Sequence, residues 1–101
     1  MSQIKLCKLD TIPQGELRQF NTGEIEVLVI NSNGQYYCLA ARCTHAGAPL
    51  LEGELSGDVL TCPWHYSHFR ITDGSVVQGP AKKSLQVYSG TIKDGYLFIE
   101  I

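Results

Sequence analysis

Residues 43–69, CTHAGAPLLEGELSGDVLTCPWHYSHF, carry a Cys-x-His pair and a Cys-x-x-His pair on one short segment. Cys43 and His45 form the first pair, and Cys62 and His65 form the second after sixteen intervening residues. Thiolates and imidazoles are ligands both for zinc and for iron–sulfur clusters. The segment therefore predicts a metal centre, and the way the ligands are paired indicates which kind.

The pairing favours two metal ions over one. Zinc modules usually pair Cys with Cys and His with His, whereas here each Cys is paired with a His. Two loops that each give a Cys to one iron and a His to the other would place Cys43 and Cys62 on one ion and His45 and His65 on the second. Two ferric ions and two sulfides carry a charge of +2, so two thiolates bring the site to zero and ease the uptake of an electron. A structural zinc-binding module remains a remote alternative.

Length, composition and charge limit the remaining choices. With 101 residues and 44% hydrophobic content, the chain is expected to form one domain over 1–101. A net charge of −2 gives no reason to expect a nucleic acid partner. The first thirty residues lack a signal peptide, and no run approaches the roughly 18 apolar residues that span a bilayer. We expect a soluble, cytoplasmic protein with a complete N-terminus and no membrane partner.

The residues outside the ligand segment predict an all-β fold. Short runs rich in Val, Ile, Leu, Tyr and Phe are separated by ten glycines and four prolines, without sustained helical periodicity. Asn33-Gly34 and Asp94-Gly95 supply the positive φ angles that tight hairpin turns require. The predicted strands are 4–8, 16–20, 25–30, 35–40, 58–61, 84–91 and 96–101.

The ligand segment itself differs from its surroundings. Between residues 42 and 68 the chain is rich in Gly and Pro, and 58–61 is the one run in it that reads as a strand. We therefore expect a small loop-built subdomain over about 42–69, attached to a β scaffold. Irregular backbone there leaves amide N–H groups free to point at a bound anion or sulfur.

These residues resemble a known family. Cys43-Thr44-His45-Ala46-Gly47 and Cys62-Pro63-Trp64-His65 match the Rieske [2Fe–2S] motif C-x-H-x(n)-C-x-x-H, and the resemblance extends along most of the chain to a Gly79-Pro80 loop and the C-terminal hairpin. The resemblance implies stacked antiparallel β-sheets and one [2Fe–2S] cluster. It also implies that Cys43, His45, Cys62 and His65 are the ligands, with both histidines facing solvent at the tip.

Four further positions place the chain within that family. High-potential members carry two further cysteines that form a disulfide, and this chain has Ala48 and Trp64 at those positions. They also carry a Ser and a Tyr whose hydroxyls donate to the cluster sulfurs, and this chain keeps the Ser as Ser67 but has Phe69 in place of the Tyr. The chain thus resembles the soluble ferredoxins of ring-hydroxylating dioxygenase systems and is expected to have a lower potential. The residues expected around the cluster are Gly47, Trp64, Ser67, Phe69 and Pro80.

The implied function is electron transfer without catalysis. The chain shows no nicotinamide fingerprint, no mononuclear iron site and no room for a flavin domain. By resemblance, it passes electrons from a flavin-dependent reductase to a terminal oxygenase, in the catabolism of aromatic hydrocarbons. The small Rieske subunit of a nitrite reductase is the alternative.

Several other residues have ordinary explanations. Cys7 and Cys38 lie in strand-like runs and are expected to be small buried hydrophobes. His68 is expected to be a surface imidazole, not a ligand. Lys82 and Lys83 either form a solvated face or contact an acidic partner.

Overall fold

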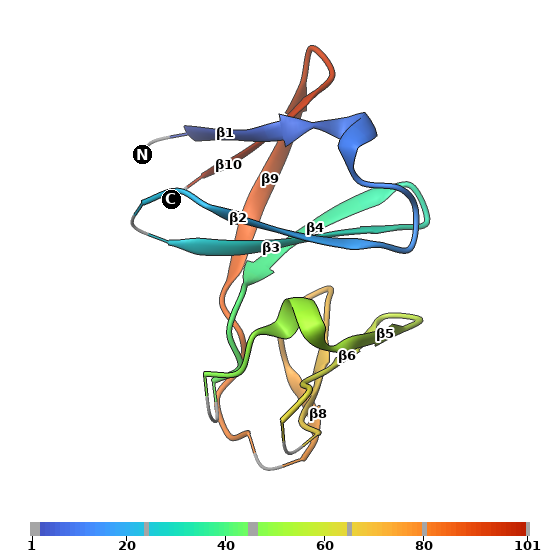
Figure 1. Ribbon diagram of the computed structural model, residues 1–101, viewed down its shortest axis with the longest axis vertical. Coiled ribbons are helices and arrows are strands. Elements are labelled where there is room, and N and C mark those ends of the chain that lie inside the picture. The colour runs from blue at the N-terminus through green and yellow to red at the C-terminus, as the bar shows by residue number, and fades with distance from the viewer. Residues whose placement is uncertain (1–2, 24, 45–46, 65, 80, 101) are drawn as a thin grey trace.

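The computed structural model describes residues 3–23, 25–44, 47–64, 66–79 and 81–100. Within these ranges the chain forms β-strands and two short 3-10 helices (Figure 1). The strands are β1 (Gln3–Lys8), β2 (Leu17–Asn21), β3 (Glu26–Ser32), β4 (Gln35–Ala40), β5 (Glu54–Ser56), β6 (Val59–Thr61), β7 (His68–Arg70), β8 (Val76–Gln78), β9 (Val87–Lys93) and β10 (Tyr96–Glu100); the helices are η1 (Leu9–Thr11) and η2 (Leu50–Glu52).

The two predicted hairpins are confirmed. Ser32 pairs with Gln35 across Asn33-Gly34, and Lys93 pairs with Tyr96 across Asp94-Gly95. Both turns have φ angles of 54° at the first central residue and 80° at the glycine. Positive φ at both central positions is the requirement of a type I′ turn, whose twist matches that of the flanking strands. These turns fix the registers of β3 with β4 and of β9 with β10.

Strand β3 is buried on both of its faces. Val27, Leu28, Val29 and Ile30 are each 0% exposed, so the middle of the strand is a continuous apolar run. Successive side chains alternate between two cores, with Val27 and Val29 in one and Leu28 and Ile30 in the other. The sheet β2–β3–β4 is therefore the middle layer of the molecule.

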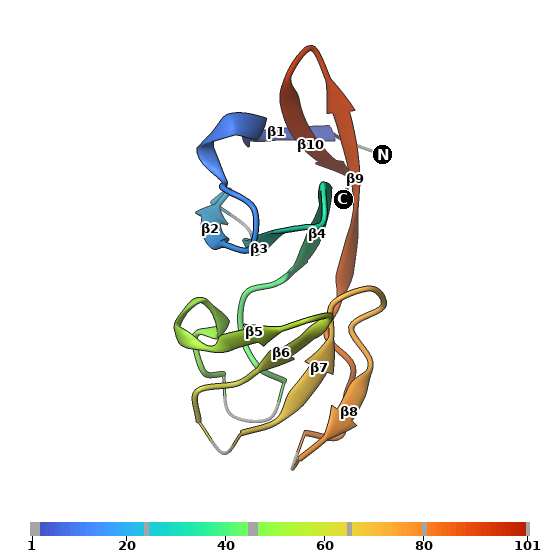
Figure 2. The ribbon, with the colours of Figure 1, turned by 90° about the vertical axis from the view of Figure 1, so that its right-hand side faces the viewer.

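The body of the protein is a six-stranded antiparallel sheet in the order β1-β10-β9-β4-β3-β2. Its two halves join where β4 meets β9, at the pairs Cys38–Tyr88 and Leu39–Val87. Figure 2 shows the sheet folded over at this junction, with β1 and β10 packed on the middle layer. The body core forms between the two halves, and its buried members are Ile12, Val27, Val29, Cys38, Leu97 and Ile99.

A second sheet, in the order β5-β6-β7-β8, forms the lower part of the molecule in Figure 1. The sequence predicted one strand here, at 58–61, and the structure has four, extending to Gln78. Each of the four is three residues long and is bounded by turns such as Gly57-Asp58, so the Gly-rich composition concealed them. The stacked antiparallel layers are confirmed, but the lower part is a small sheet that carries loops at its end.

The tip core lies between the middle layer and this small sheet. It joins Leu28, Ile30 and Leu39 of the middle layer to Leu60 and Phe69 of the small sheet. Cys43 and Cys62 belong to the same buried cluster. In the part of the chain that the structure describes, no helix is long or apolar enough to cross a bilayer.

Candidate metal centre

The loop that begins at Cys43 and carries the first predicted pair of ligands, here called the first ligand loop, leaves the middle layer just after β4. Its two arms are joined by the N–H of Leu50, which donates to the carbonyl of Ala41 at 2.9 Å. Inside the loop, the Cys43 N–H donates to the Ala48 carbonyl at 3.0 Å, and the Gly47 N–H donates to the Cys43 carbonyl at 2.9 Å. Gly47 has a φ of 71°, a conformation that glycine adopts without strain. The loop is thus a closed turn with Cys43 at its start.

The second ligand loop follows β6 directly. The N–H of Cys62 donates to the carbonyl of Ser67 at 2.8 Å, which closes the loop below β6 and β7. Tyr66 has a φ of 58°, which is uncommon for a residue other than glycine and marks a tight reversal at this point. Cys62 therefore starts the second loop as Cys43 starts the first.

A third segment, in which the structure describes Gly79 and residues 81–83, contacts both loops. The N–H of Ala81 donates to Ser67 Oγ at 3.1 Å, and Thr44 Oγ1 donates to the Lys83 carbonyl at 2.6 Å. Gly79 has a φ of 104°, and a Cβ added there would lie 2.6 Å from the Cα of Ser67. Glycine is required at this position because the two backbones approach so closely. The segment holds the two ligand loops in fixed relative positions.

The two loop cysteines lie together in the tip core. Cys43 is 3% exposed and Cys62 is 0% exposed. Burial raises the pKa of the Cys62 thiol; the Trp64 backbone N–H lowers that pKa by bonding the sulfur, and the neighbouring Cys43 thiol raises it. Cys43 and Cys62 are therefore neighbours in the tip core, although they lie nineteen positions apart in the sequence. Ferric iron would offset the cost of ionising both thiols in this buried setting.

The other predicted site residues, ligands and surrounding residues alike, fall into three groups. Ser67 and Phe69 are both 0% exposed, and the Ser67 hydroxyl accepts a bond from the Ala81 amide, which leaves its own proton available for another acceptor. Trp64 is 50% exposed and so is not ordinary core. His45, His65 and Pro80 lie outside the described residues.

The remaining sequence expectations have mixed outcomes. Cys38 is buried in the body core and Cys7 packs against it, as predicted for small hydrophobes. None of the four cysteines, all within the described ranges, forms a disulfide, and Ala48 and Trp64 stand at the positions of the bridge that the high-potential proteins have. His68 is half-buried in β7, so it is more covered than the expected surface imidazole.

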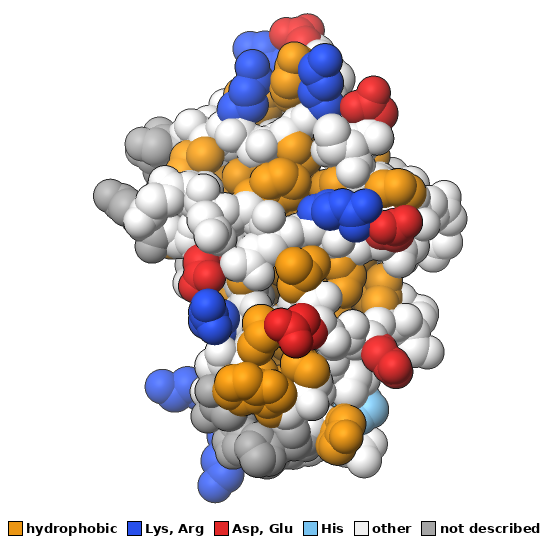
Figure 3. Space-filling view, viewed as in Figure 1, with side chains coloured by type: hydrophobic (Ala, Val, Ile, Leu, Met, Phe, Trp, Pro, Cys, Tyr) orange, Lys and Arg blue, Asp and Glu red, His pale blue; other side chains and the backbone are white. Residues whose placement is uncertain are grey.

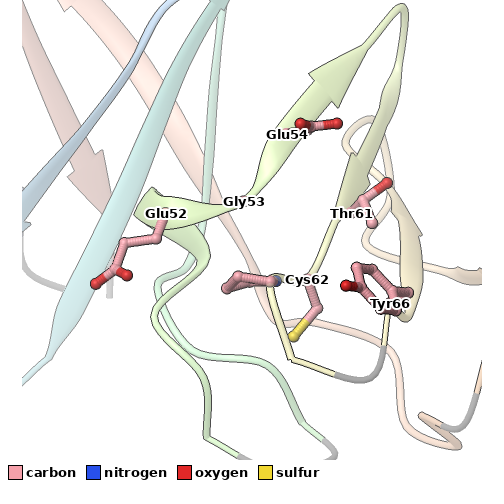
Figure 4. Close-up of a pocket in the computed structure, with 7 residues that line it drawn as sticks. Glu52, Gly53, Glu54, Thr61, Cys62 and Tyr66 are labelled. Atoms are coloured by element: carbon pink, nitrogen blue, oxygen red, sulfur yellow. The ribbon is translucent and has the colours of Figure 1, made fainter.

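A pocket of about 240 Å³ lies beside the second loop (Figure 4). Glu52, Glu54 and Tyr66 contribute to its lining, and Cys62 forms part of its wall. In Figure 4 the Cys62 sulfur points away from the Tyr66 ring. Because Cys62 has no exposed surface, the pocket does not give solvent access to the sulfur.

Several large apolar side chains are exposed in the lower part of the molecule. Leu51, Trp64, Tyr66 and Val77 are 42%, 50%, 70% and 46% exposed. Figure 3 shows hydrophobic side chains at the surface over the lower part of the molecule, with basic side chains projecting at its edge. Exposed apolar surface of this kind is typical of a protein contact site.

Sequence reasoning missed the polar contacts of Arg42 at this end of the molecule. Arg42, the residue before Cys43, bonds Glu26 of β3 through Nε at 2.9 Å and Nη2 at 3.3 Å. Its Nη1 donates to the Gly47 carbonyl at 3.1 Å. The Arg42 side chain holds the pKa of the Glu26 carboxyl below its usual range. The position of Arg42 beside a predicted ligand was a signal, but its partner sixteen residues earlier was not visible in the sequence.

Comparison with known proteins identifies the family. The model of the Rieske [2Fe-2S] domain matches residues 2–89. The chain belongs to the Rieske [2Fe-2S] domain family. Its cofactor is one Rieske-type [2Fe–2S] cluster, as expected. The adjacent buried thiols at the starts of the two loops fit this cofactor, because two neighbouring thiolates could bind one iron of such a cluster.

Relatives include proteins of similar and of much greater length. Ferredoxin CarAc of Metapseudomonas resinovorans is 32% identical over 102 residues, covering 98% of this chain and 95% of that protein. Human apoptosis-inducing factor 3 is 31% identical over 97 residues, which cover 96% of this chain but 16% of that protein. The chain therefore spans about a sixth of the length of the latter relative.

Solved structures confirm the fold. The Sphingomonas yanoikuyae B1 ferredoxin superposes with a TM-score of 0.93 at 27% identity, covering 99% of both chains. A chain in the complex of reduced oxygenase and oxidised ferredoxin in carbazole 1,9a-dioxygenase superposes with a TM-score of 0.90 at 31% identity, covering 96% of this chain and 91% of that one. The Rieske ferredoxin fold thus covers nearly the whole chain.

Proposed function

We propose that this protein is a one-electron carrier whose [2Fe–2S] cluster is held by Cys43 and Cys62 on one iron and by His45 and His65 on the other. The observation that carries the proposal is the meeting of Cys43 and Cys62, buried side by side at the starts of two hydrogen-bonded loops. When bound, the cluster supplies a one-electron redox couple.

The rest of the chain holds the site and shields it. The Ala81 amide and the Thr44 hydroxyl fix the loops against residues 79–83, so the ligand positions do not have to reorganise with each electron. Phe69 and the tip core exclude water from the sulfur side. We infer that the single domain spans 1–101, with its cluster-binding subdomain at about 42–69 supported by a sheet that extends to Gln78.

The proposed partners are a flavin-dependent reductase as donor and a terminal oxygenase as acceptor, each bound transiently. Support comes from the relatives: one structure is a complex of an oxygenase with a ferredoxin, and another relative is named as a 3-phenylpropionate/cinnamic acid dioxygenase ferredoxin subunit. The apolar surface formed by Leu51, Trp64 and Tyr66 suits such a contact. We place the pathway in the cytoplasm, without a nucleic acid or membrane partner.

The proposal includes a low reduction potential. Ser67 is kept as a hydroxyl donor, while Phe69 has no hydroxyl and the loop disulfide is absent. Fewer donors to the cluster sulfurs stabilise the reduced state less. Protein-film voltammetry should give a midpoint in the lower half of the Rieske range of about −150 to +300 mV. A midpoint near the upper limit would contradict this part of the proposal.

The electron-carrier role is tested by reconstitution. The purified protein, reduced by a flavin-dependent ferredoxin reductase with NADH, should be reoxidised by a ring-hydroxylating oxygenase in the presence of its aromatic substrate. A Cys62→Ala variant is the control and should carry no electrons. Transfer to an assimilatory nitrite reductase instead would support the alternative subunit role, and a protein that contains zinc in place of iron and sulfide would overturn both.

A further inference from the structure

The first ligand loop is tied to the middle layer by one side chain. Arg42 places two N–H groups on the Glu26 carboxylate, at 2.9 and 3.3 Å, and a third on the Gly47 carbonyl at 3.1 Å. Glu26 is the first residue of β3, and its Oε2 atom also accepts a bond from Gln19 Nε2 at 3.1 Å. The contacts with Glu26 therefore fix the orientation of the Arg42 guanidinium relative to the middle layer, independently of its bond to the loop.

This contact is a poor candidate for a stabilising salt bridge. The Arg42 and Glu26 side chains are 54% and 37% exposed, and exposed ion pairs contribute little to folding. The third bond is different, because it ends on the backbone of the loop that starts with Cys43. Its effect is to fix the orientation of one peptide group.

The peptide between Gly47 and Ala48 is constrained at both ends. The Gly47 N–H bonds the Cys43 carbonyl, the Gly47 carbonyl bonds Arg42, and the Ala48 carbonyl accepts the Cys43 N–H. In a trans peptide the C=O and the following N–H point in opposite directions. Since the Gly47 carbonyl accepts a bond from Arg42, the Ala48 N–H of the same peptide points away from the guanidinium. Ala48 is 0% exposed, so this donor is closed to water.

We propose that Arg42, held by Glu26, is a positioning residue that aims the Ala48 N–H at the sulfurs of the Cys43 end of the cluster and thereby raises the reduction potential. The inference rests on the proposed function. An amide aimed at sulfur stabilises the extra negative charge of the reduced state, as hydrogen bonds to cluster sulfurs generally do. The role requires the planar, forked guanidinium, because a lysine ammonium does not hold the carboxylate and the carbonyl in this geometry.

The test compares midpoint potentials of purified holoproteins by voltammetry. Arg42→Gln and Arg42→Lys should both shift the potential downward, although Arg42→Lys keeps the positive charge. Glu26→Ala should also shift it downward, because the guanidinium loses its anchor. Simple loss of a negative charge would instead shift the potential of Glu26→Ala upward. The sign of that shift therefore separates positioning from through-space electrostatics.

The chain offers a matched control pair. Arg18 and Glu16 form another exposed ion pair, at 2.8 Å, in which the Arg18 Nη1 atom also reaches a backbone carbonyl, that of Leu17. They lie outside the ligand loops, so Arg18→Gln and Glu16→Ala should leave the potential unchanged. The shifts in the Arg42 and Glu26 variants should persist at about 1 M salt, where the Debye length is about 3 Å and exposed charges are screened.

The outcomes are distinct. An upward shift in Glu26→Ala, an unchanged potential in Arg42→Lys, or shifts that vanish at high salt would overturn the positioning role while leaving the electron-carrier proposal intact. If Arg42→Gln fails to retain a cluster, Arg42→Lys and Glu26→Ala still decide the sign. A wild-type protein without a Rieske signal would overturn the proposed function and this inference with it.

Discussion

The two cores of this protein bury cysteines in different backbone settings. In the body core, Cys38 lies within β4, and its backbone pairs with Val29 on one side and Tyr88 on the other. In the tip core, Cys43 and Cys62 lie at the starts of loops, and their amides close short turns. All three side chains are nearly or fully buried. Burial alone therefore does not distinguish a structural cysteine from a proposed ligand, whereas the backbone around the cysteine does differ between them.

The difference has a physical basis. A strand fixes the direction of its side chains by alternation and uses its amides in the ladder, so a strand cysteine behaves as a small hydrophobe. A loop leaves side chains and amides free to converge on a point outside the ladder. Both of the loops that begin with the tip cysteines are hydrogen-bonded to one further segment, through Ala81 and Lys83. The same type of substitution should therefore affect the cluster differently in the body core and in the tip core.

The largest expected difference is between Cys62→Ala and Cys38→Ala. Cys62→Ala should abolish cluster binding, because one iron loses half of its thiolates. Cys38→Ala should retain a full cluster and lose about 1 kcal/mol of stability from the missing buried atom. Iron and acid-labile sulfide analysis with the visible absorption spectrum measures the first effect. A Cys62→Ala protein with a normal cluster would break the comparison.

Truncation of a large buried side chain should lower the free energy of unfolding by a similar amount in either core. It should change the spectrum of the cluster only when the side chain belongs to the tip core. Leu60→Ala and Ile99→Ala each empty a fully buried site and should cost about 2–5 kcal/mol in denaturant unfolding. Leu60 belongs to the core that contains Cys43 and Cys62, so its variant should also alter the visible circular dichroism of the cluster. An unaltered cluster spectrum in Leu60→Ala would show that the tip core does not shape the surroundings of the cluster. An altered spectrum in Ile99→Ala would show that the two cores are not independent.

A smaller difference in stability is expected between substitutions of two glycines with positive φ, Gly95 in the body and Gly79 beside the second ligand loop. Gly95→Ala places a Cβ in open space and should cost about 1–2 kcal/mol from the left-handed conformation alone. Gly79→Ala adds a contact of 2.6 Å with the Cα of Ser67, so it should cost more and displace the second ligand loop. Thermal unfolding gives the costs, and the rate of iron release to a chelator reports the displacement. Equal rates of iron release in the two variants would show that the segment containing Gly79 does not position the second ligand loop.

The smallest effect is a pH dependence in the body core. Burial raises the pKa of the Cys38 thiol to about 12, and Cys7 adds to the shift. A raised pKa means that the folded protein holds the proton more tightly, so the contribution of Cys38 to stability is complete below pH 9 and declines as the pH rises toward 12. The stability difference between the wild type and Cys38→Ala, measured by urea unfolding against pH, should shrink over that interval. A difference that is constant with pH would contradict the assignment.

Local sequence signals predicted much of the fold. The Asn33-Gly34 and Asp94-Gly95 turns, each with the required positive φ angles, located two hairpins directly. The apolar run at 25–30 corresponds to the doubly buried β3. The strands of the small sheet were largely missed because three residues are too few to show alternation, and their stability comes from pairing with one another.

The sequence predicted which residues form the candidate site, but not the contacts that hold their loops in place. Cys43 and Cys62 were found because their spacing to histidine is unusual. The contacts of Arg42 with Glu26 and of Thr44 with Lys83 join residues sixteen and thirty-nine positions apart, and they depend on how the layers stack. No local pattern encodes such contacts, so they appeared only with the folded structure.

The most direct test of the central claim is the EPR spectrum of the dithionite-reduced protein. Ligation of one iron by two cysteines and of the other by two histidines predicts a Rieske signal, with an average g value below that of clusters with four cysteine ligands, together with hyperfine couplings to imidazole nitrogen. An average g value typical of all-cysteine ligation, or an EPR-silent reduced protein, would contradict the account.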